Sequence, residues 1–179
     1  MLIVVALLVL VWGVWVFNRL VHDRNLVAQA FADIDVQLKR RADLVPQLVE
    51  AVKAYAAYER QTLQAVTELR TRAATLADRG PSASRFGAES ELGVALSRLV
   101  LLQENYPALK ADQNFRDLAA KLVDVEDHLQ HARRFYNGAV KQYVTRLQTF
   151  PDVIVGKLFM FREAAFFETE DRAAVQVAL

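Results

Sequence analysis

The residues of this chain best suited to chemistry are acidic and basic side chains that lie on or beside long apolar stripes. Arg41 and Glu59 fall on a stripe itself, where a charge between packed helices needs a partner of opposite sign. We therefore expect one polar interhelical cluster. Its predicted members are Arg41, Glu50, Glu59, Glu104, Glu126, Arg133 and Asn137, with Asp35, Arg40 and Asp43 beside them on the first helix of the body.

Two interpretations of this cluster remain open. The favoured one is a set of ion pairs and hydrogen bonds that fix the register of the helices, as polar residues do in coiled coils. The alternative is a polar pocket for a small ligand, or a docking groove for a partner, near Pro46, because a proline kinks a helix and can open space beside it.

A metal site is the weaker interpretation of His128 and His131. They are spaced i and i+3, with Asp124, Glu126 and Asp127 close by. One helix offers only two imidazoles, whereas a di-metal site in a bundle takes a Glu-x-x-His pair from each of two helices. We expect a solvated helix face here, with no metal and no cofactor.

Enzyme and nucleic-acid functions find little support in the composition. The chain has no cysteine, no Gly-x-Ser-x-Gly elbow and no glycine-rich phosphate loop after a strand. Its net charge of +1, from 22 basic and 21 acidic residues, lacks the basic excess of a nucleic-acid binder. We expect a protein that is not an enzyme and has no nucleic-acid partner.

The N-terminus predicts a membrane anchor. Residues 2–17 contain no charge, and the apolar run to residue 21 approaches the roughly 20 residues that a spanning helix needs. Trp12, Trp15 and Arg19 suit the edge of a bilayer. A cleaved signal peptide or a buried core helix fits less well, because the run lacks both small-residue punctuation and a polar face. We assign residues 1–21 to a retained anchor that contacts the lipid bilayer through residues 2–21.

Basic residues follow this run and none precedes it, apart from the α-amino group. By the positive-inside tendency, the body is predicted on the cytoplasmic side of the inner membrane of a single-pass protein.

The remainder predicts an all-α fold, in which the N-terminal transmembrane helix is followed by an antiparallel bundle of about four long helices. Six glycines and four prolines are few for a strand-and-turn fold. Apolar residues recur in alternating steps of three and four, in phase on both sides of Pro46, so we expect a kinked but continuous helix there. The predicted body helices cover residues 27–76, 86–106 and 115–150, with breaks at 78–84 and 105–112.

The segment after Pro151 is rich in phenylalanine. We expect a last short helix packed on the bundle, and a partner or membrane-surface patch is the alternative. The bundle is assigned to residues 22–168 and a frayed tail to 169–179.

Several motifs are specific at the level of a family. IDVQLKRRADLVPQLVE, YPALKADQNF and the phenylalanine-rich end, behind an N-terminal apolar helix, resemble the LemA family of bacterial membrane proteins. The resemblance implies an antiparallel helical bundle on one transmembrane helix, and no established reaction. Phe31, Gln47, Tyr58 and Val144 depart from the usual pattern of that family.

These observations predict a membrane-anchored, non-enzymatic scaffold or interaction protein of the bacterial envelope. Its expected partners are other membrane or envelope proteins, with self-association possible. The alternative is a ligand-binding sensor, or an accessory subunit of a membrane-bound quality-control protease, with its pocket between the helices near Pro46.

Overall fold

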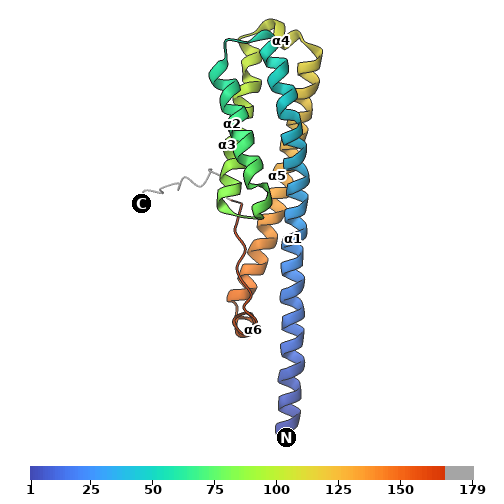
Figure 1. Ribbon diagram of the computed structural model, residues 1–179. Helices are drawn as coiled ribbons and strands as arrows, with labels where there is room; N and C mark the ends of the chain where they lie inside the picture. Colours follow the sequence, from blue (N-terminus) through green and yellow to red (C-terminus); the bar gives the residue numbers. More distant parts are fainter. Residues whose placement is uncertain (168–179) are drawn as a thin grey trace, which may run out of the picture. The chain divides into compact units, whose positions relative to one another are not determined.

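The computed structural model describes residues 1–167, and this part of the chain is all-α without a strand, as predicted. The predicted tail at residues 169–179 lies outside the described residues. The described chain forms two compact units, one of residues 1–34 and 131–166, and one of residues 35–130 with Phe167. The elements (Figure 1) are α1 (Leu2–Tyr55), α2 (Arg60–Leu76), the 3-10 turn η1 (Ala77–Arg79), α3 (Ala83–Leu101), the 3-10 turn η2 (Leu102–Glu104), α4 (Pro107–Ala111), α5 (Gln113–Gln148) and α6 (Asp152–Leu158).

The unit of residues 35–130 is an up-down-up-down bundle of α1, α2, α3 and α5 (Figure 1). The apolar stripe of the sequence forms its core, since Val45, Leu48 and Val52 of α1 are buried. The core also includes Ala56, Val66, Ala73, Leu92, Leu96, Leu99, Leu109, Phe115, Leu118 and Leu122. Burial of a large aliphatic side chain contributes roughly 1.5–3 kcal/mol, so this stripe is the main source of stability in the unit.

The prediction of one helix over residues 27–76 is wrong at one point. α1 continues through Pro46 as expected, but it ends at Tyr55, and α2 begins only at Arg60. The turn between them holds the segment Ala56–Glu59, closed by a hydrogen bond from the Glu59 amide to the Ala56 carbonyl at 3.1 Å. The segment contains neither glycine nor proline, and the apolar spacing is the same on both sides, so the sequence carried no signal for a chain reversal.

Both predicted breaks interrupt the long helices, although the second, at residues 105–112, contains the short helix α4. Before α3, Gly80 adopts a φ of 66°, which favours glycine, and Ser82 caps the helix by accepting a hydrogen bond from the Arg85 amide. Before α5, Asp112 accepts a hydrogen bond from the Phe115 amide at 2.7 Å. The helices after the breaks differ from prediction at their ends, since α3 stops at Leu101 and α5 covers Gln113–Gln148.

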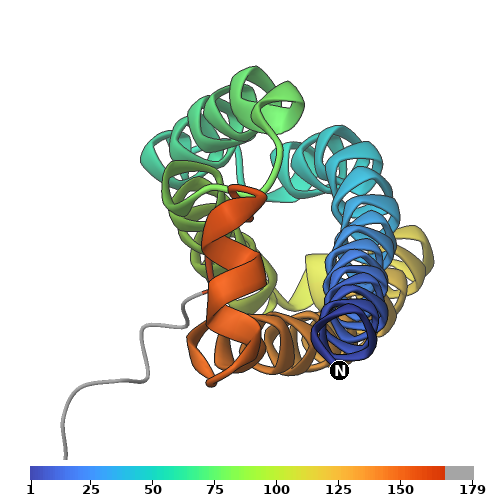
Figure 2. The ribbon, with the colours of Figure 1, turned by 90° about the horizontal axis from the view of Figure 1, so that it is seen from below.

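The unit of residues 1–34 and 131–166 pairs the first part of α1 with the last part of α5, and α6 completes it (Figure 2). α6 packs closely on α5, because a Cβ at Gly156 would lie 3.0 Å from Cδ2 of Leu147. A short helix after Pro151 is therefore present, as expected, but it ends at Leu158, before the phenylalanines of that segment. It ends in a Schellman turn, in which the Phe161 amide bonds the Gly156 carbonyl at 2.9 Å and Met160 adopts a φ of 55°.

Candidate functional site

Arg41 of α1 is the centre of a buried charge network in the unit of residues 35–130. Its side chain is fully buried and donates hydrogen bonds to partners on two other helices. Nη2 bonds the carbonyl of Glu89 on α3 at 2.9 Å and forms a short ion pair with the Glu89 carboxylate, and Nη1 bonds Oε1 of Glu126 on α5 at 3.0 Å. A buried guanidinium with this many charged partners locks three helices together.

A second ion pair joins α1 and α3 nearer the N-terminal ends of these two helices. Nη2 of the buried Arg85 lies 2.5 Å from Oδ1 of Asp35. Because Arg85 and Glu89 are four residues apart on α3, they present opposite charges one turn apart to α1. A cavity of about 330 Å³ lies beside both, between α1, α2 and α3, and Lys39, Arg70 and Asp78 also line it.

Glycine makes room for this network. A Cβ built at Gly93 of α3 would lie 3.2 Å from Nη1 of Arg41, closer than ordinary van der Waals contact. Gly93 is one turn beyond Glu89, so α3 supplies both an acceptor and the space for the guanidinium.

Pro46 has a specific backbone consequence. Proline lacks the amide hydrogen that would bond the Ala42 carbonyl within the helix. Nε of Arg70 on α2 lies 3.2 Å from that carbonyl oxygen and donates to it. The neighbouring helix thereby satisfies the acceptor that the proline leaves open, and α1 and α2 gain a contact at the level of Pro46.

Two tyrosine–carboxylate pairs lie at the end of this unit where α1 stops and α5 begins; we call this end the tip. The hydroxyl of Tyr55, at the end of α1, donates to Oδ2 of Asp112 at 2.9 Å, and that of Tyr106 donates to Oε1 of Glu59 at 2.9 Å. The Phe115 amide and then the Tyr55 hydroxyl lower the pKa of Asp112. The bond to Glu59, with partial burial, raises the pKa of Tyr106.

The predicted polar cluster is thus divided. Arg41 and Glu126 are in contact, whereas Glu59 bonds Tyr106, Glu104 pairs with Lys110 at 3.1 Å, and the exposed Glu50 lies 3.9 Å from Lys53. Arg133 and Asn137 belong to the other unit. Sequence reasoning missed Glu89, the closest partner of Arg41, although its four-residue spacing from Arg85 on an amphipathic helix was a usable signal.

His128 and His131 each lie near a group of α5 itself. Nδ1 of His128 is 2.8 Å from the Asp124 carbonyl oxygen, and Nδ1 of His131 is 2.9 Å from Nη2 of Arg134. Both imidazoles are exposed on α5.

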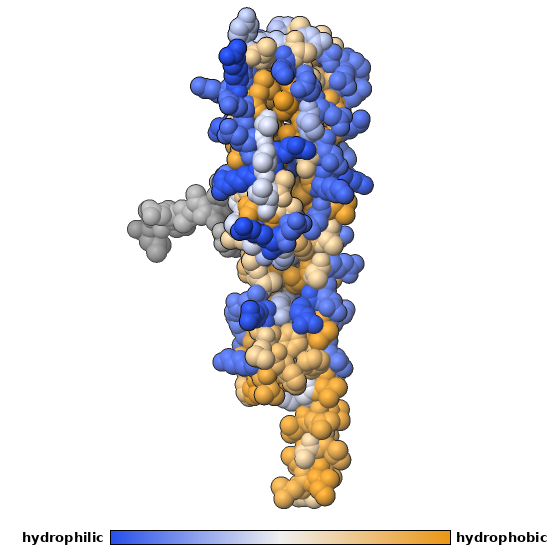
Figure 3. Space-filling view, in the orientation of Figure 1, coloured by the Kyte–Doolittle hydropathy of each residue, from blue (hydrophilic) through white to orange (hydrophobic). Residues whose placement is uncertain are grey.

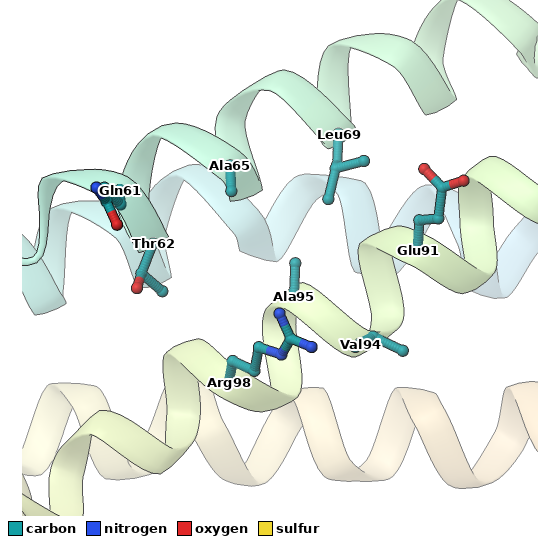
Figure 4. Close-up of a pocket in the computed structure, with 8 residues that line it drawn as sticks. All are labelled: Gln61, Thr62, Ala65, Leu69, Glu91, Val94, Ala95 and Arg98. Atoms are coloured by element: carbon teal, nitrogen blue, oxygen red, sulfur yellow. The ribbon is translucent and has the colours of Figure 1, made fainter.

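A groove does lie beside Pro46, with a volume of about 620 Å³. Of the predicted cluster residues only Glu50 lines it, together with Gln47, Tyr55, Asp112 and Asn114. A second groove of about 580 Å³ runs between α2 and α3, where Ala65 and Ala95 point toward one another and Glu91 and Arg98 stand on its rim (Figure 4).

The other unit has its own buried carboxylate. Asp23 is 2% exposed, and its Oδ2 lies 2.6 Å from Nε of Arg146 on α5. Gln142 donates to its Oδ1 at 3.2 Å. On the same helix, burial raises the pKa of Tyr136 to about 12, and its hydroxyl donates to the Ala165 carbonyl at 2.7 Å. These contacts bind α1, α5 and the segment after α6 to one another.

Comparison with known proteins decides the family. The model of the LemA family matches residues 30–179. The chain belongs to the LemA family. The match includes Arg41, Glu89 and Glu126, so the whole buried network of the LemA-type bundle lies within it.

Similar LemA-type sequences include protein LemA of Metamycoplasma hominis, which is 24% identical over 155 residues, or 86% of this chain and 69% of that protein. Magnetosome protein MamQ 2 of Paramagnetospirillum magneticum is 23% identical over 160 residues. That alignment covers 76% of this chain and 59% of the relative, so the chain spans well under two thirds of the MamQ protein.

Proposed function

We propose that this LemA-family chain is a membrane-anchored, non-enzymatic interaction protein of the bacterial inner membrane, with its body in the cytoplasm. One observation supports the membrane anchor in this proposal. The first part of α1 is long and apolar enough to cross a membrane by length and composition, and the fold buries only 6% of its most apolar stretch. The same helix continues without a break into the bundle, which it therefore attaches to the anchor.

The charge network supports an interaction protein more than a sensor. In the unit of residues 35–130, the guanidinium of Arg41 is bonded on both Nη atoms, and Arg85 is paired with Asp35. Buried ionic groups that satisfy one another hold helices in register, and they have little residual capacity for a charged ligand.

Photo-crosslinking in native membranes tests the proposal. A photoreactive amino acid is placed in the full chain at exposed apolar positions of this unit, namely Val36, Val94, Leu101 and Val123. Capture and mass spectrometry should recover a membrane or envelope protein, or a second copy, from at least one position. Leu96, 1% exposed, is the matched control and should yield no intermolecular product. Recovery of uncomplexed chain alone from all positions would contradict the proposal.

Topology requires its own measurement. Protease added to inverted inner-membrane vesicles should digest the body, and protease added to right-side-out vesicles should leave it intact. The reverse pattern would move the body to the periplasmic side and overturn the proposed orientation.

A second candidate function rests on the groove beside Pro46. Its volume of about 620 Å³, and a lining in which Glu50, Asp112 and Asn114 stand among apolar side chains, favour a ligand-binding sensor, or an accessory subunit of an envelope quality-control protease. A metabolite that raises the melting temperature of the full chain in micelles, and fails to do so after Asn114→Leu, would support this alternative. No shift across a metabolite panel would count against it.

A further inference from the structure

Exposed apolar side chains gather around α6, next to the end of the proposed anchor. The large ones are Phe150, Ile154, Leu158, Phe159 and Met160, with exposed fractions of 53–81%. We call these five residues the α6 patch. Ile154 and Leu158 are four residues apart and share one face of α6, whereas Val155 and Gly156 on another face are buried. The space-filling view shows hydrophobic surface in this region adjoining the apolar stretch of α1 (Figure 3).

The α6 patch is in direct contact with the anchor, within one unit of the fold. The ring of Phe17 lies edge-on to Phe159 at 4.8 Å between centroids, and to Phe161 at 5.6 Å. Phe17 precedes the end of the apolar run at residue 21 by four residues, or about 6 Å at the helical rise of 1.5 Å per residue. If residues 2–21 span the bilayer, the ring of Phe159 lies just inside its surface.

Basic side chains border the same region. The Arg24 guanidinium lies 5.4 Å from the centroid of Phe161, and that of Arg19 lies 5.0 Å from the ring of Trp15. Lys157 is exposed on α6 between the apolar residues. Apolar groups beside basic side chains that can reach lipid phosphates are typical of elements that lie in the membrane interface.

The backbone at Met160 gives an independent indication. Met160 occupies the position after the helix end where the chain adopts a left-handed conformation, φ 55°, and where glycine is the usual residue. A methionine there is 81% exposed, so it gains no packing in the fold that offsets the unfavourable backbone. An apolar side chain at such a position is explained if it is buried in something outside the chain.

We infer that the α6 patch inserts into the interfacial layer of the same leaflet from which the anchor emerges. The inference rests on the proposed membrane anchor and adds a second lipid contact to it. α6 and Met160 then lie at the membrane surface, and the anchor and the patch together hold this unit against the lipid.

Single-cysteine spin labelling tests the inference, because the chain contains no cysteine of its own. The full chain is reconstituted in vesicles of phosphatidylcholine and phosphatidylglycerol with a nitroxide at Leu158→Cys or Met160→Cys. Val9→Cys reports on the anchor, and Tyr58→Cys, 93% exposed in the α1–α2 turn, is the aqueous control. Collision rates with oxygen, which enters lipid, and with a nickel chelate, which stays in water, are compared.

Oxygen collisions should exceed nickel collisions at Leu158, Met160 and Val9, and the reverse should hold at Tyr58. Preference for oxygen at Val9 but for nickel at both patch positions would overturn the inference and leave the anchor intact. Preference for nickel at Val9 as well would overturn the anchor and the proposed function. Dipolar broadening at the patch that vanishes on dilution with unlabelled chain would assign the patch to a second copy instead, which also overturns the inference.

Discussion

Nη1 of Arg41 lies against α3 at Gly93, with 3.2 Å between it and the position that a Cβ would take. The guanidinium cannot retreat without loss of its bonds to Glu89 or Glu126. Gly93→Ala should therefore lower the free energy of unfolding by about 1–3 kcal/mol, the range for overpacking of a core. Chemical denaturation of the full chain in micelles measures the change.

Gly87, on the same helix, is the matched control, because nothing lies within 4 Å of a Cβ built there. Gly87→Ala should raise the stability by roughly 0.5–1 kcal/mol through helix propensity. Equal responses of the two variants would show that Gly93 makes no room for Arg41.

Removal of the Arg41 charge should be among the most damaging changes in the chain. Arg41→Met leaves the buried carboxylate of Glu89 without its ion-pair partner, and the expected loss is about 3–5 kcal/mol. The exposed pair of Arg72 and Glu91, 2.6 Å apart, is the comparison. Arg72→Met should cost less than about 1 kcal/mol, since water screens that pair. Thermal unfolding of both variants measures the difference, and a loss at Arg41 no larger than that at Arg72 would refute the buried network.

Pro46 and Arg70 should be energetically coupled through the Ala42 carbonyl. In the native chain, Arg70→Met leaves that acceptor without the Nε donor, whereas after Pro46→Ala the helix supplies its own amide. Arg70→Met should thus cost about 0.5–1.5 kcal/mol less in the Pro46→Ala background. A double-mutant cycle measures this coupling, and strict additivity would mean that Arg70 makes no useful bond to the carbonyl.

A fall in pH should lower the stability of the fold through protonation of Asp112 at the tip of the bundle. The amide of Phe115 and the hydroxyl of Tyr55 lower the pKa of this carboxyl in the folded chain. The contribution of Asp112 to the free energy of unfolding is therefore complete above its pKa in the unfolded chain, about 3.9. This contribution is lost as the pH falls through the lower pKa of the folded chain. Asp112→Asn keeps a cap for α5 but cannot titrate. Stability measured against pH below 5 should fall less steeply in the variant, and parallel curves would contradict the assignment.

Much of the fold was predictable from the sequence, because apolar spacing reports directly which helix face is buried. Val45, Leu48 and Val52 were expected in the core and are there. The same spacing failed at the Ala56–Glu59 turn, since a stripe that keeps its phase does not require one continuous helix. Two antiparallel helices can share a core and have the same periodicity on each side of the reversal.

The charge network was less predictable, for a different reason. Periodicity places Arg41 on a buried face and Glu126 beside one, but it does not show which residues of two neighbouring helices face each other. Glu59 and Glu104 were therefore expected beside Arg41, whereas each found a nearer partner at the tip, Tyr106 and Lys110. Glu89 was overlooked because the spacing of apolar residues does not fix how far α3 is shifted along α1.

The order of charges on α3 has one more consequence. α1 and α3 run in the same direction, and Asp35 meets Arg85 as Arg41 meets Glu89, so the signs alternate on both helices. Displacement of α3 by one turn toward the C-terminal end of α1 would carry Arg85 toward Arg41 and leave both carboxylates without their cations. Like charges would then repel where opposite charges now attract. The charge order on α1 and α3 therefore permits one register of the two helices and disfavours the register shifted by one turn.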